Sequence, residues 1–200
     1  MITNTHKACR RYGIKLCQSD KCPVLRRNYP PGIHGVKGKR RLTEYGTQLR
    51  EKQIAKAVYG LMEKQFVNYY KEAIRREGDT GQILQELLEN RLDNVVYRAG
   101  FAKTRRMARQ MVNHGLFQVN GKKLDIPSYQ VKIKDEISIK PEKINSKVFA
   151  EIDKKLKDHQ TPSWMSLDPA KKVVKIAGKP GPDDTEKLFN TRLIVEFYSR

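Results

Sequence analysis

The sequence predicts an α+β protein in which helices are followed by a short hairpin. Apolar residues recur at helical spacing in several segments of residues 43–113. Over residues 117–139 they alternate instead, around the Asn120-Gly121 pair that two-residue hairpin turns prefer. Residues 1–42 show neither pattern. We therefore predict a basic N-terminal arm, a small helical domain and a helix-helix-hairpin module.

The chain is strongly basic. Its 200 residues include 41 Lys and Arg against 22 Asp and Glu, which gives a net charge of +19. Like charges repel one another in a compact protein unless a polyanion screens them, so nucleic acid is the expected partner. A membrane surface is the second candidate partner, but no long basic amphipathic helix stands out. The sequence also has no signal peptide and no apolar run near about 18 residues, so no membrane partner is expected. The expected location is the cytosol or an equivalent compartment.

The N-terminal arm, residues 1–42, contains little that could form a core of its own. Residues 1–50 include 12 Lys and Arg and only 2 acidic residues, and Pro30-Pro31-Gly32 interrupts any helix. Such a basic, polar segment is expected to become ordered along phosphates.

Three cysteines and a histidine lie close together within the arm. They are spaced as two pairs, His6-x2-Cys9 and Cys17-x4-Cys22, which suits a tetrahedral zinc site that would fix the arm. Disulfides are not expected in a reducing compartment, and an odd number of cysteines would leave one thiol over. The alternative is three unligated cysteines and an unrelated histidine.

Three helices are predicted over residues 43–90. Thr43 can cap the first helix, which Tyr59-Gly60 interrupts, and the second covers about Met62 to Arg76. Thr80 can cap the third helix. The apolar face of that helix consists of Ile83, Leu84, Leu87 and Leu88.

The core of the module, residues 91–139, opens with two short helices. The first ends at Gly100, and Thr104 caps the second. Their apolar stripes consist of Leu92, Val95, Val96 and Ala99, then Met107, Ala108, Met111 and Val112. Three arginines lie on the other face of the second helix, and residues 103–114 contain no acid, so we expect this face to bind an anion. They are Arg105, Arg106 and Arg109.

A hairpin follows the two helices. It turns at Asn120-Gly121 and continues into Lys122 and Lys123. Two more strands are predicted over residues 129–133 and 137–139, on either side of a turn. Further along, we predict a helix over residues 143–158 and a loop over residues 175–184.

Several segments of the chain carry a resemblance to a known family. Within the module, RLDNVVYR, GFA, ARQ, VNG and PSY resemble the RNA-binding module named after the small-subunit ribosomal protein S-four. Outside it, RRNYPPG, QLREKQ, PSWMSLD and LIVEFYSR resemble the bacterial form of the same family. The resemblance implies that the module, with its following helix and loop, is inserted as residues 91–187. Residues 188–200 would then complete the helical domain of residues 43–90.

The resemblance implies a structural, non-enzymatic constituent of the small ribosomal subunit. It implies direct binding to small-subunit ribosomal RNA, a role in early assembly and in translational accuracy, and a place near the mRNA entry path beside neighbouring ribosomal proteins. The implied location is the cytoplasmic ribosome, with an organellar ribosome left open. Carried onto this chain, the phosphate contacts would be Arg26, Arg27, Lys39, Arg40, Arg41, Arg50, Lys52, Arg105, Arg106, Arg109, Lys122 and Lys123.

Some members of this family carry an N-terminal zinc site of four cysteines. The resemblance places Cys9, Cys17 and Cys22 at three of those positions. His6 falls at the fourth, and the gap between the two pairs is shorter here than in the members that bind zinc.

Two alternatives stay open at this point. The basic face could be an ordinary solvated surface. The chain could also be an RNA-modifying enzyme, because some pseudouridine synthases carry the same module and Arg91-Leu92-Asp93 echoes their catalytic triplet. We interpret the triplet instead as a helix cap, because it opens the first helix of the module and an acid favours a helix N-terminus. The sequence has no Gly-rich phosphate loop with lysine and no paired carboxylates in an apolar setting, so no enzyme is expected.

Overall fold

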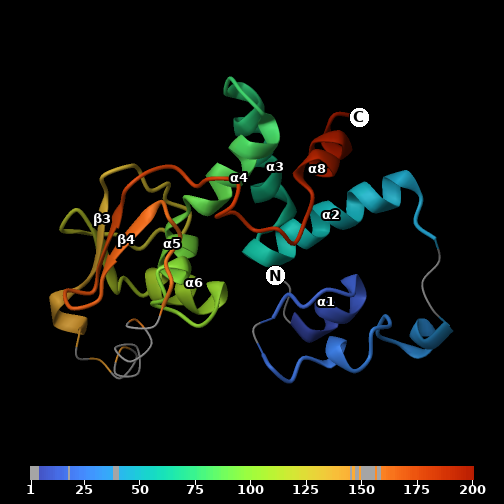
Figure 1. Ribbon diagram of the computed structural model, residues 1–200, viewed down its shortest axis with the longest axis horizontal. Coiled ribbons are helices and arrows are strands. Elements are labelled where there is room, and N and C mark those ends of the chain that lie inside the picture. The colour runs from blue at the N-terminus through green and yellow to red at the C-terminus, as the bar shows by residue number, and fades with distance from the viewer. Residues whose placement is uncertain are drawn as a thin grey trace. The chain divides into compact units, whose positions relative to one another are not determined.

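The computed structural model describes residues 5–17, 19–37, 41–144, 146, 149, 156 and 159–200. The chain divides into two compact units, which are visible in Figure 1. The first unit contains residues 1–84 and 186–200, and the second contains residues 85–185. Helices and an antiparallel sheet are both present, which confirms the α+β class. The predicted segment boundaries stay predictions, because this division does not separate the arm from the helices that follow it.

The first unit consists of helices. In chain order, they are α1 (Thr5–Tyr12), the 3-10 helices η1 (Pro23–Leu25) and η2 (Ile33–Lys37), α2 (Glu44–Tyr59), α3 (Glu63–Arg75), the start of α4 (Thr80–Glu89), and α8 (Thr191–Tyr198). None of the helices in the described part of the chain is both long and apolar enough to cross a membrane.

Helix caps follow the sequence signals closely. The Thr43 hydroxyl accepts a hydrogen bond from the Gly46 N–H at 3.1 Å, which confirms Thr43 as the cap of α2. For α4 the predicted cap is wrong by one residue. The Asp79 carboxylate accepts from the Gly81 N–H at 2.9 Å, and Thr80 is already the first helical residue. Asp and Thr are both good caps, so the sequence alone could not separate them.

Helix α8 packs beside α2 (Figure 1). It also contacts α3 through aromatic side chains. Tyr198 stacks on Tyr70 with ring centroids 4.7 Å apart and on Phe66 at 6.3 Å. Phe66 and Ile194 are fully buried. A helix more than a hundred residues away in sequence therefore completes the hydrophobic core of the first unit.

Glu63 forms the polar connection between these three helices. Its carboxylate accepts hydrogen bonds from Lys52 at 2.8 Å, Lys56 at 2.6 Å and the Tyr198 hydroxyl at 2.8 Å. Burial raises the pKa of Glu63, but these donors outweigh it and lower the pKa from the usual 4.5 to about 2. Burial, together with the negative charge of Glu63, raises the pKa of Tyr198.

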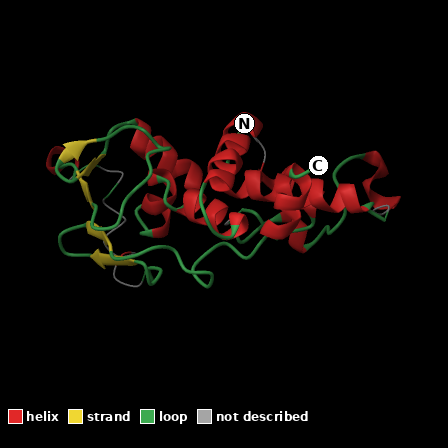
Figure 2. Cartoon of the chain, turned by 90° about the horizontal axis from the view of Figure 1, so that it is seen from above, coloured by secondary structure: helices red, strands yellow, loops and turns green. Residues whose placement is uncertain are grey.

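In its described residues, the second unit combines the end of α4 and two further helices with a five-stranded antiparallel sheet, where all the described strands lie (Figure 2). The helices are α5 (Leu92–Arg98) and α6 (Arg105–Asn113). The strands are β1 (Phe117–Val119), β2 (Lys122–Lys123), β3 (Glu136–Ile139), β4 (Met165–Asp168) and β5 (Val173–Ile176), in the order β2-β1-β3-β5-β4, and the 3-10 helix η3 (Pro141–Lys143) follows β3.

The helices of this unit agree with their sequence patterns. The α5 stripe of Leu92, Val95, Val96 and Ala99 is buried, and so is the α6 stripe except for Met107, which is partly buried. Thr104 caps α6 by accepting from the Met107 N–H at 3.0 Å. Asn120 and Gly121 have φ angles of 51° and 77°, which confirms the predicted hairpin turn.

The strand predictions are only partly correct. Residues 129–133 do not join the sheet, because the Leu92 N–H donates to the Tyr129 carbonyl at 2.9 Å and the Val131 N–H donates to the Asn90 carbonyl at 2.8 Å. This segment therefore pairs with the start of α5 instead. Strands β4 and β5 were not predicted, and β5 includes two residues of the predicted loop over 175–184. The helix predicted over residues 143–158 falls largely outside the described residues.

Replacing Glu63 with Gln should destabilise the first unit in a pH-dependent way. Because the folded-state pKa is depressed, the stabilisation is fully present above about pH 4.5 and is lost as the pH falls toward 2. The Glu63 side chain is 43 % exposed, so after allowing for solvent screening we expect a loss of about 1–2 kcal/mol at pH 7. Urea unfolding followed by circular dichroism at pH 7 and pH 3 measures the free energy of unfolding of the variant and of the unchanged chain at each pH.

The matched control is Glu72→Gln, because Glu72 pairs with Arg76 at 3.2 Å on the surface of α3. Its expected cost is below about 0.5 kcal/mol at either pH. A Glu63→Gln effect as small as the control, or one that persists unchanged at pH 3, would contradict the assignment.

Candidate functional site

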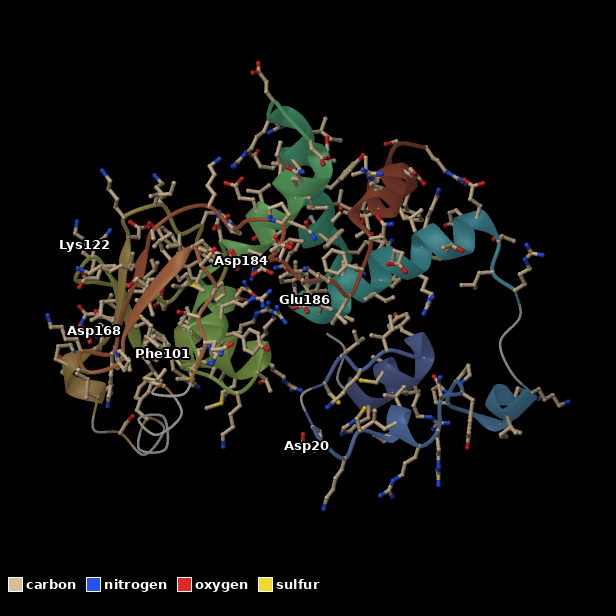
Figure 3. The ribbon with its side chains drawn as sticks, viewed as in Figure 1. Asp20, Phe101, Lys122, Asp168, Asp184 and Glu186 are labelled. Carbon is tan, nitrogen blue, oxygen red and sulfur yellow. The ribbon has the colours of Figure 1, made fainter. Side chains whose placement is uncertain are left out.

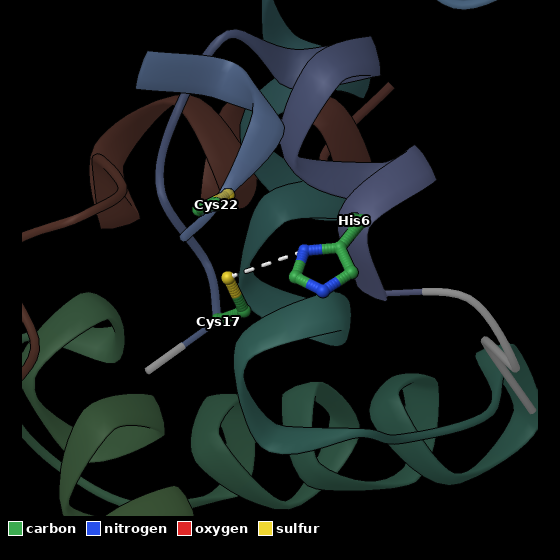
Figure 4. A group of neighbouring side chains, drawn as sticks. All are labelled: His6, Cys17 and Cys22. Atoms are coloured by element: carbon green, nitrogen blue, oxygen red, sulfur yellow. Dashed lines mark hydrogen bonds between the residues drawn. The ribbon is translucent and has the colours of Figure 1, made fainter. Parts of the chain in front are cut away.

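A cluster of one histidine and two cysteines, side chains of types that can bind a metal ion, lies between α1 and η1. His6 projects from α1, Cys17 lies in the loop that follows, and Cys22 directly precedes η1. Their ligand atoms all lie within 4.8 Å of one another, and Cys17 Sγ is 3.7 Å from His6 Nδ1. Figure 4 shows the imidazole facing Cys17, with Cys22 beside them. This set of one imidazole and two thiols is suited to holding a metal ion.

Cys9 lies close to the same cluster, on α1. Its Sγ accepts a hydrogen bond from the Leu16 N–H at 3.2 Å, and burial, with the neighbouring Cys17, raises the pKa of its thiol to about 11. Burial also raises the pKa of Cys22, but hydrogen bonds from the Val24 N–H and from the side chains of His6, Cys17 and Cys9 outweigh it and bring the pKa to about 7. The structure thus groups three of the four predicted ligands, and the role of Cys9 stays a prediction.

Helix α1 is also tied to the following loop through Arg10. Its guanidinium donates to the carbonyls of Tyr29 and Pro30, both at 3.2 Å, and lies 4.8 Å from the centroid of the Tyr29 ring. Gly35 lies so close to the Pro30 carbonyl that a Cβ there would be 1.8 Å from its oxygen. The arm therefore has defined internal contacts around the RRNYPPG segment. The role of Arg10 in these contacts was not predicted from the sequence.

The predicted phosphate contacts of the first unit differ in their surroundings. Arg26, Arg27 and Arg41 are exposed, whereas Lys39 and Arg40 lie outside the described residues. Arg50 is half-buried and donates to the Tyr12 carbonyl at 2.6 Å. Lys52 is buried, its ammonium pairs with Glu63, and it lies 4.4 Å from the centroid of the Phe197 ring. Contacts within the first unit thus engage the Lys52 ammonium, and the predicted phosphate contact is not needed to explain this lysine.

The hairpin presents its two lysines to solvent. Lys122 and Lys123 are both exposed on β2, and Figure 3 shows Lys122 at the outer edge of the sheet. Lys123 pairs with Asp125 only loosely, with an Nζ–Oδ2 distance of 3.8 Å and both side chains 56 % exposed.

The arginines of α6 are less uniform than their spacing suggested. Arg106 is exposed, but Arg105 and Arg109 are half-buried. Arg109 Nη2 lies 2.7 Å from Asp93 Oδ2, so a carboxylate sixteen positions earlier in the chain neutralises it. Residues 103–114 contain no acid, so this partner of Arg109, which lies outside that segment, could not be inferred from it.

Asp93 is buried in the first turn of α5. Its carboxylate accepts from Arg91 Nε at 3.0 Å and Nη2 at 2.8 Å, as well as from Arg109. It does not cap the helix, since the cap position is Arg91 and no side chain caps there. The predicted helix cap is thus wrong, although Asp93 does lie in the first turn of α5, and its carboxylate pairs with two arginines instead.

A second buried carboxylate lies at the end of α4. Glu89 accepts from Arg98 at 2.8 and 3.1 Å and from Asn94 Nδ2 at 2.6 Å. Asn94 Oδ1 in turn accepts from Arg105 Nε at 2.7 Å. The network around Asp93 therefore joins α5 to α6. The network around Glu89 joins α4 to α5 and, through Asn94, reaches Arg105 of α6. Neither Glu89, Asn94 nor Arg98 was singled out from the sequence.

Comparison with known proteins covers nearly the whole chain. A family model described as "Ribosomal protein S4/S9 N-terminal domain" matches residues 1–89, and an "S4 domain" model matches residues 90–137. The chain is 46 % identical to small ribosomal subunit protein uS4 of Syntrophomonas wolfei and 44 % identical to that of Thermus thermophilus. Each alignment covers 97 % of this chain and 96 % of the relative.

Replacing Asp93 with Asn should strongly destabilise the second unit. The change leaves Arg91 and Arg109 beside a neutral amide, and breaking a buried ion pair on one side typically costs about 3–5 kcal/mol. Urea unfolding followed by fluorescence of Trp164, the single tryptophan, which is buried in the same core, reports this loss. Asp125→Asn, at an exposed pair, is the control, and equal stability of the two variants would disprove the role given to Asp93.

Proposed function

This chain belongs to the family of small ribosomal subunit protein uS4, and from that premise we propose that it is a structural constituent of the small ribosomal subunit. It binds small-subunit ribosomal RNA directly and is not an enzyme. The observation that carries the proposal is the relationship over nearly the full length of both chains. The net charge of +19 fits the same partner, since a polyanion screens the repulsion within the chain.

The proposed RNA interface consists of exposed cations on both units. Its members with the clearest exposure are Arg26, Arg27, Arg41, Arg106, Lys122 and Lys123. Cations on helix surfaces and a hairpin suit folded RNA, whose wide minor groove and phosphates are recognised by shape and charge. Arg50, Arg105 and Arg109 are half-buried, and they belong to the proposed interface through the exposed part of each side chain. Lys39 and Arg40 remain predicted contacts. Lys52 is left out of the interface because it is buried and pairs with Glu63.

Further roles follow from the family membership as proposals. The chain acts on the cytoplasmic ribosome, contacts neighbouring small-subunit proteins, and contributes to early assembly, to the mRNA entry region and to translational accuracy. No membrane takes part in this function.

The RNA-modifying enzyme is not supported as an alternative. The relatives from Syntrophomonas wolfei and Thermus thermophilus, of which the alignment covers 96 %, are small ribosomal subunit proteins. In addition, Arg91-Leu92-Asp93 is buried, and its carboxylate is held between two arginines. A catalytic aspartate has to reach its substrate, which this surrounding does not allow.

We propose that the arm contains a structural zinc site in which Cys9 joins His6, Cys17 and Cys22. The donors are an imidazole and thiols, the usual ligands of structural zinc, and four of them fit its tetrahedral preference. The hydrogen bonds that lower the pKa of Cys22 favour the thiolate that zinc requires. A bound ion would hold the first residues of the arm in place, because the small apolar cluster of Cys9, Cys22 and Val24 is a weak core.

The chain purified without added metal should contain about one zinc per molecule. His6→Ala and Cys9→Ser should each lower the zinc affinity by at least about tenfold, since each removes one ligand. Inductively coupled plasma mass spectrometry and competition with a chromogenic chelator measure content and affinity. His34→Ala, an exposed histidine on η2, is the control and should bind normally. Zinc binding that is unchanged in Cys9→Ser would exclude Cys9 as a ligand.

Binding to a transcript of small-subunit ribosomal RNA should weaken steeply as salt rises. Each phosphate contact contributes about 0.7–0.9 to the slope of log K against log salt. The double changes Arg26→Ala, Arg27→Ala and Lys122→Ala, Lys123→Ala should each lower that slope by about 1.5. Filter binding at a series of KCl concentrations gives the slope.

Lys64→Ala, Lys71→Ala removes the same charge from α3, where both lysines are exposed but lie outside the proposed interface. We expect a slope change below about 0.5 for this control. Equal losses in all three double variants would mean that the net charge of the chain, rather than these sites, determines binding.

A further inference from the structure

The turn over residues 132–135 contains a lysine where the backbone favours glycine. The Asp135 N–H donates to the Lys132 carbonyl at 3.1 Å, and Lys134, the third residue of the turn, has a φ angle of 74°. A positive φ at the third position is what a type II turn requires, and glycine or asparagine usually occupies it because a Cβ is strained there. A lysine kept in this conformation therefore calls for a reason in its side chain.

The neighbouring strands hold this turn in place on both sides. The Lys134 N–H donates to the Ile176 carbonyl at 2.9 Å, and the Ile176 N–H donates to the Asp135 carbonyl at 3.0 Å. On the β1 side, Asn120 Nδ2 donates to Asp135 Oδ1 at 2.8 Å, and Asn120 Oδ1 accepts from the Glu136 N–H at 3.0 Å. The turn is therefore fixed between the end of β5 and the hairpin turn of β1 and β2, so a strained residue can persist in it.

These contacts bring three lysines to one end of the sheet. Lys122, labelled in Figure 3, is the first residue of β2 after the hairpin turn, and Lys132 and Lys134 lie in the neighbouring turn. All three side chains are exposed. Within the part of the chain that the structure describes, none of the three ammonium groups forms a salt bridge or a hydrogen bond. Their charges are therefore available to an external anion.

The acids beside these lysines have partners of their own. Asp135 is buried, and its Oδ2 accepts from the Lys132 backbone N–H at 2.8 Å, in addition to the hydrogen bond from Asn120. Glu136 Oε2 lies 3.2 Å from Lys175 Nζ. Both carboxylates thus stabilise the turn and the sheet, and neither forms a salt bridge with the three lysines.

We infer that Lys132 and Lys134 form a further phosphate-binding site for structured RNA, continuous with Lys122 and Lys123 of the hairpin. Neither Lys132 nor Lys134 was among the phosphate contacts predicted from the sequence. Cations around two adjoining turns suit folded RNA, whose backbone is recognised by shape and charge. Because the backbone of the turn is already fixed, binding orders only the side chains, which keeps the entropic cost low. The inference rests on the proposed function, since it takes ribosomal RNA as the source of the phosphate.

Two variants at position 134 separate the contact from the strain. Lys134→Ala and Lys134→Gly both remove the ammonium group, but only glycine relieves the strain of the positive φ. With a small-subunit ribosomal RNA transcript, both should lower the slope of log K against log salt by about 0.7–0.9 and weaken binding about three- to sixfold near about 0.1 M KCl. The urea midpoint of unfolding should nevertheless be higher for Lys134→Gly than for Lys134→Ala. Weaker binding by the more stable variant cannot come from misfolding.

Three further variants define the contribution of charge. Lys134→Arg keeps the cation and should bind the transcript with the slope of the unchanged chain. Lys132→Ala combined with Lys134→Gly should lower the slope by about 1.5. The matched control is Lys71→Ala, which removes one exposed lysine from α3, outside the proposed interface, and should change the slope by less than about 0.3.

Three results would overturn the inference. They are unchanged RNA binding by Lys134→Gly, an equal loss of slope in Lys71→Ala, and a urea midpoint that is no higher for Lys134→Gly than for Lys134→Ala. Unchanged RNA binding would leave Lys134 to an acidic protein partner instead. Each of these results, in a chain that otherwise binds the transcript, overturns the inference alone. If the unchanged chain shows no salt-dependent binding to the transcript, the proposed function fails, and the inference fails with it.

Discussion

The pairing of buried carboxylates with arginines is the constraint on which the second unit depends. Asp93 and Glu89 are both buried, and neither charge could remain there without a cation beside it. Arg91 and Arg98, at the two ends of α5, and Arg109 of α6 provide those cations. Because guanidinium groups bind carboxylates in a defined geometry, the ion pairs fix how α5 and α6 pack as well as neutralising the acids.

The local part of this fold could be predicted because its signals are local. Thr43 and Thr104 cap their helices, and Asn120-Gly121 turns the hairpin, through contacts no more than a few residues long. Residues 129–133 were misassigned because their partners, Asn90 and Leu92, lie 41 and 37 positions before Val131 and Tyr129. Strands β4 and β5 are only four residues long, so alternation over so short a run is a weak signal.

The candidate sites likewise include residues that local sequence signals identify and residues that only tertiary contacts identify. Spacing alone identified the residues that form the His6, Cys17 and Cys22 cluster, because a metal site in a short segment leaves its ligands close in sequence. Counting charges identified the exposed Lys122 and Lys123 but could not separate them from Lys52, which lies buried beside Glu63. Whether a lysine faces solvent or a carboxylate depends on tertiary contacts. Asn94 illustrates the limit, since nothing in its sequence neighbourhood marks it as the link between an acid and an arginine.

The return of α8 to the first unit imposes an order on biosynthesis. All of residues 85–185 leave the translating ribosome before Thr191–Tyr198 do, whereas α2 and α3 emerge earlier than either. The apolar faces of α2 and α3 therefore remain without Tyr198 and Ile194 until the whole second unit has been synthesised. During that interval Phe66 and Tyr70 lack the ring of Tyr198 that stacks on them in the complete chain, and transiently exposed apolar surface of this kind favours aggregation.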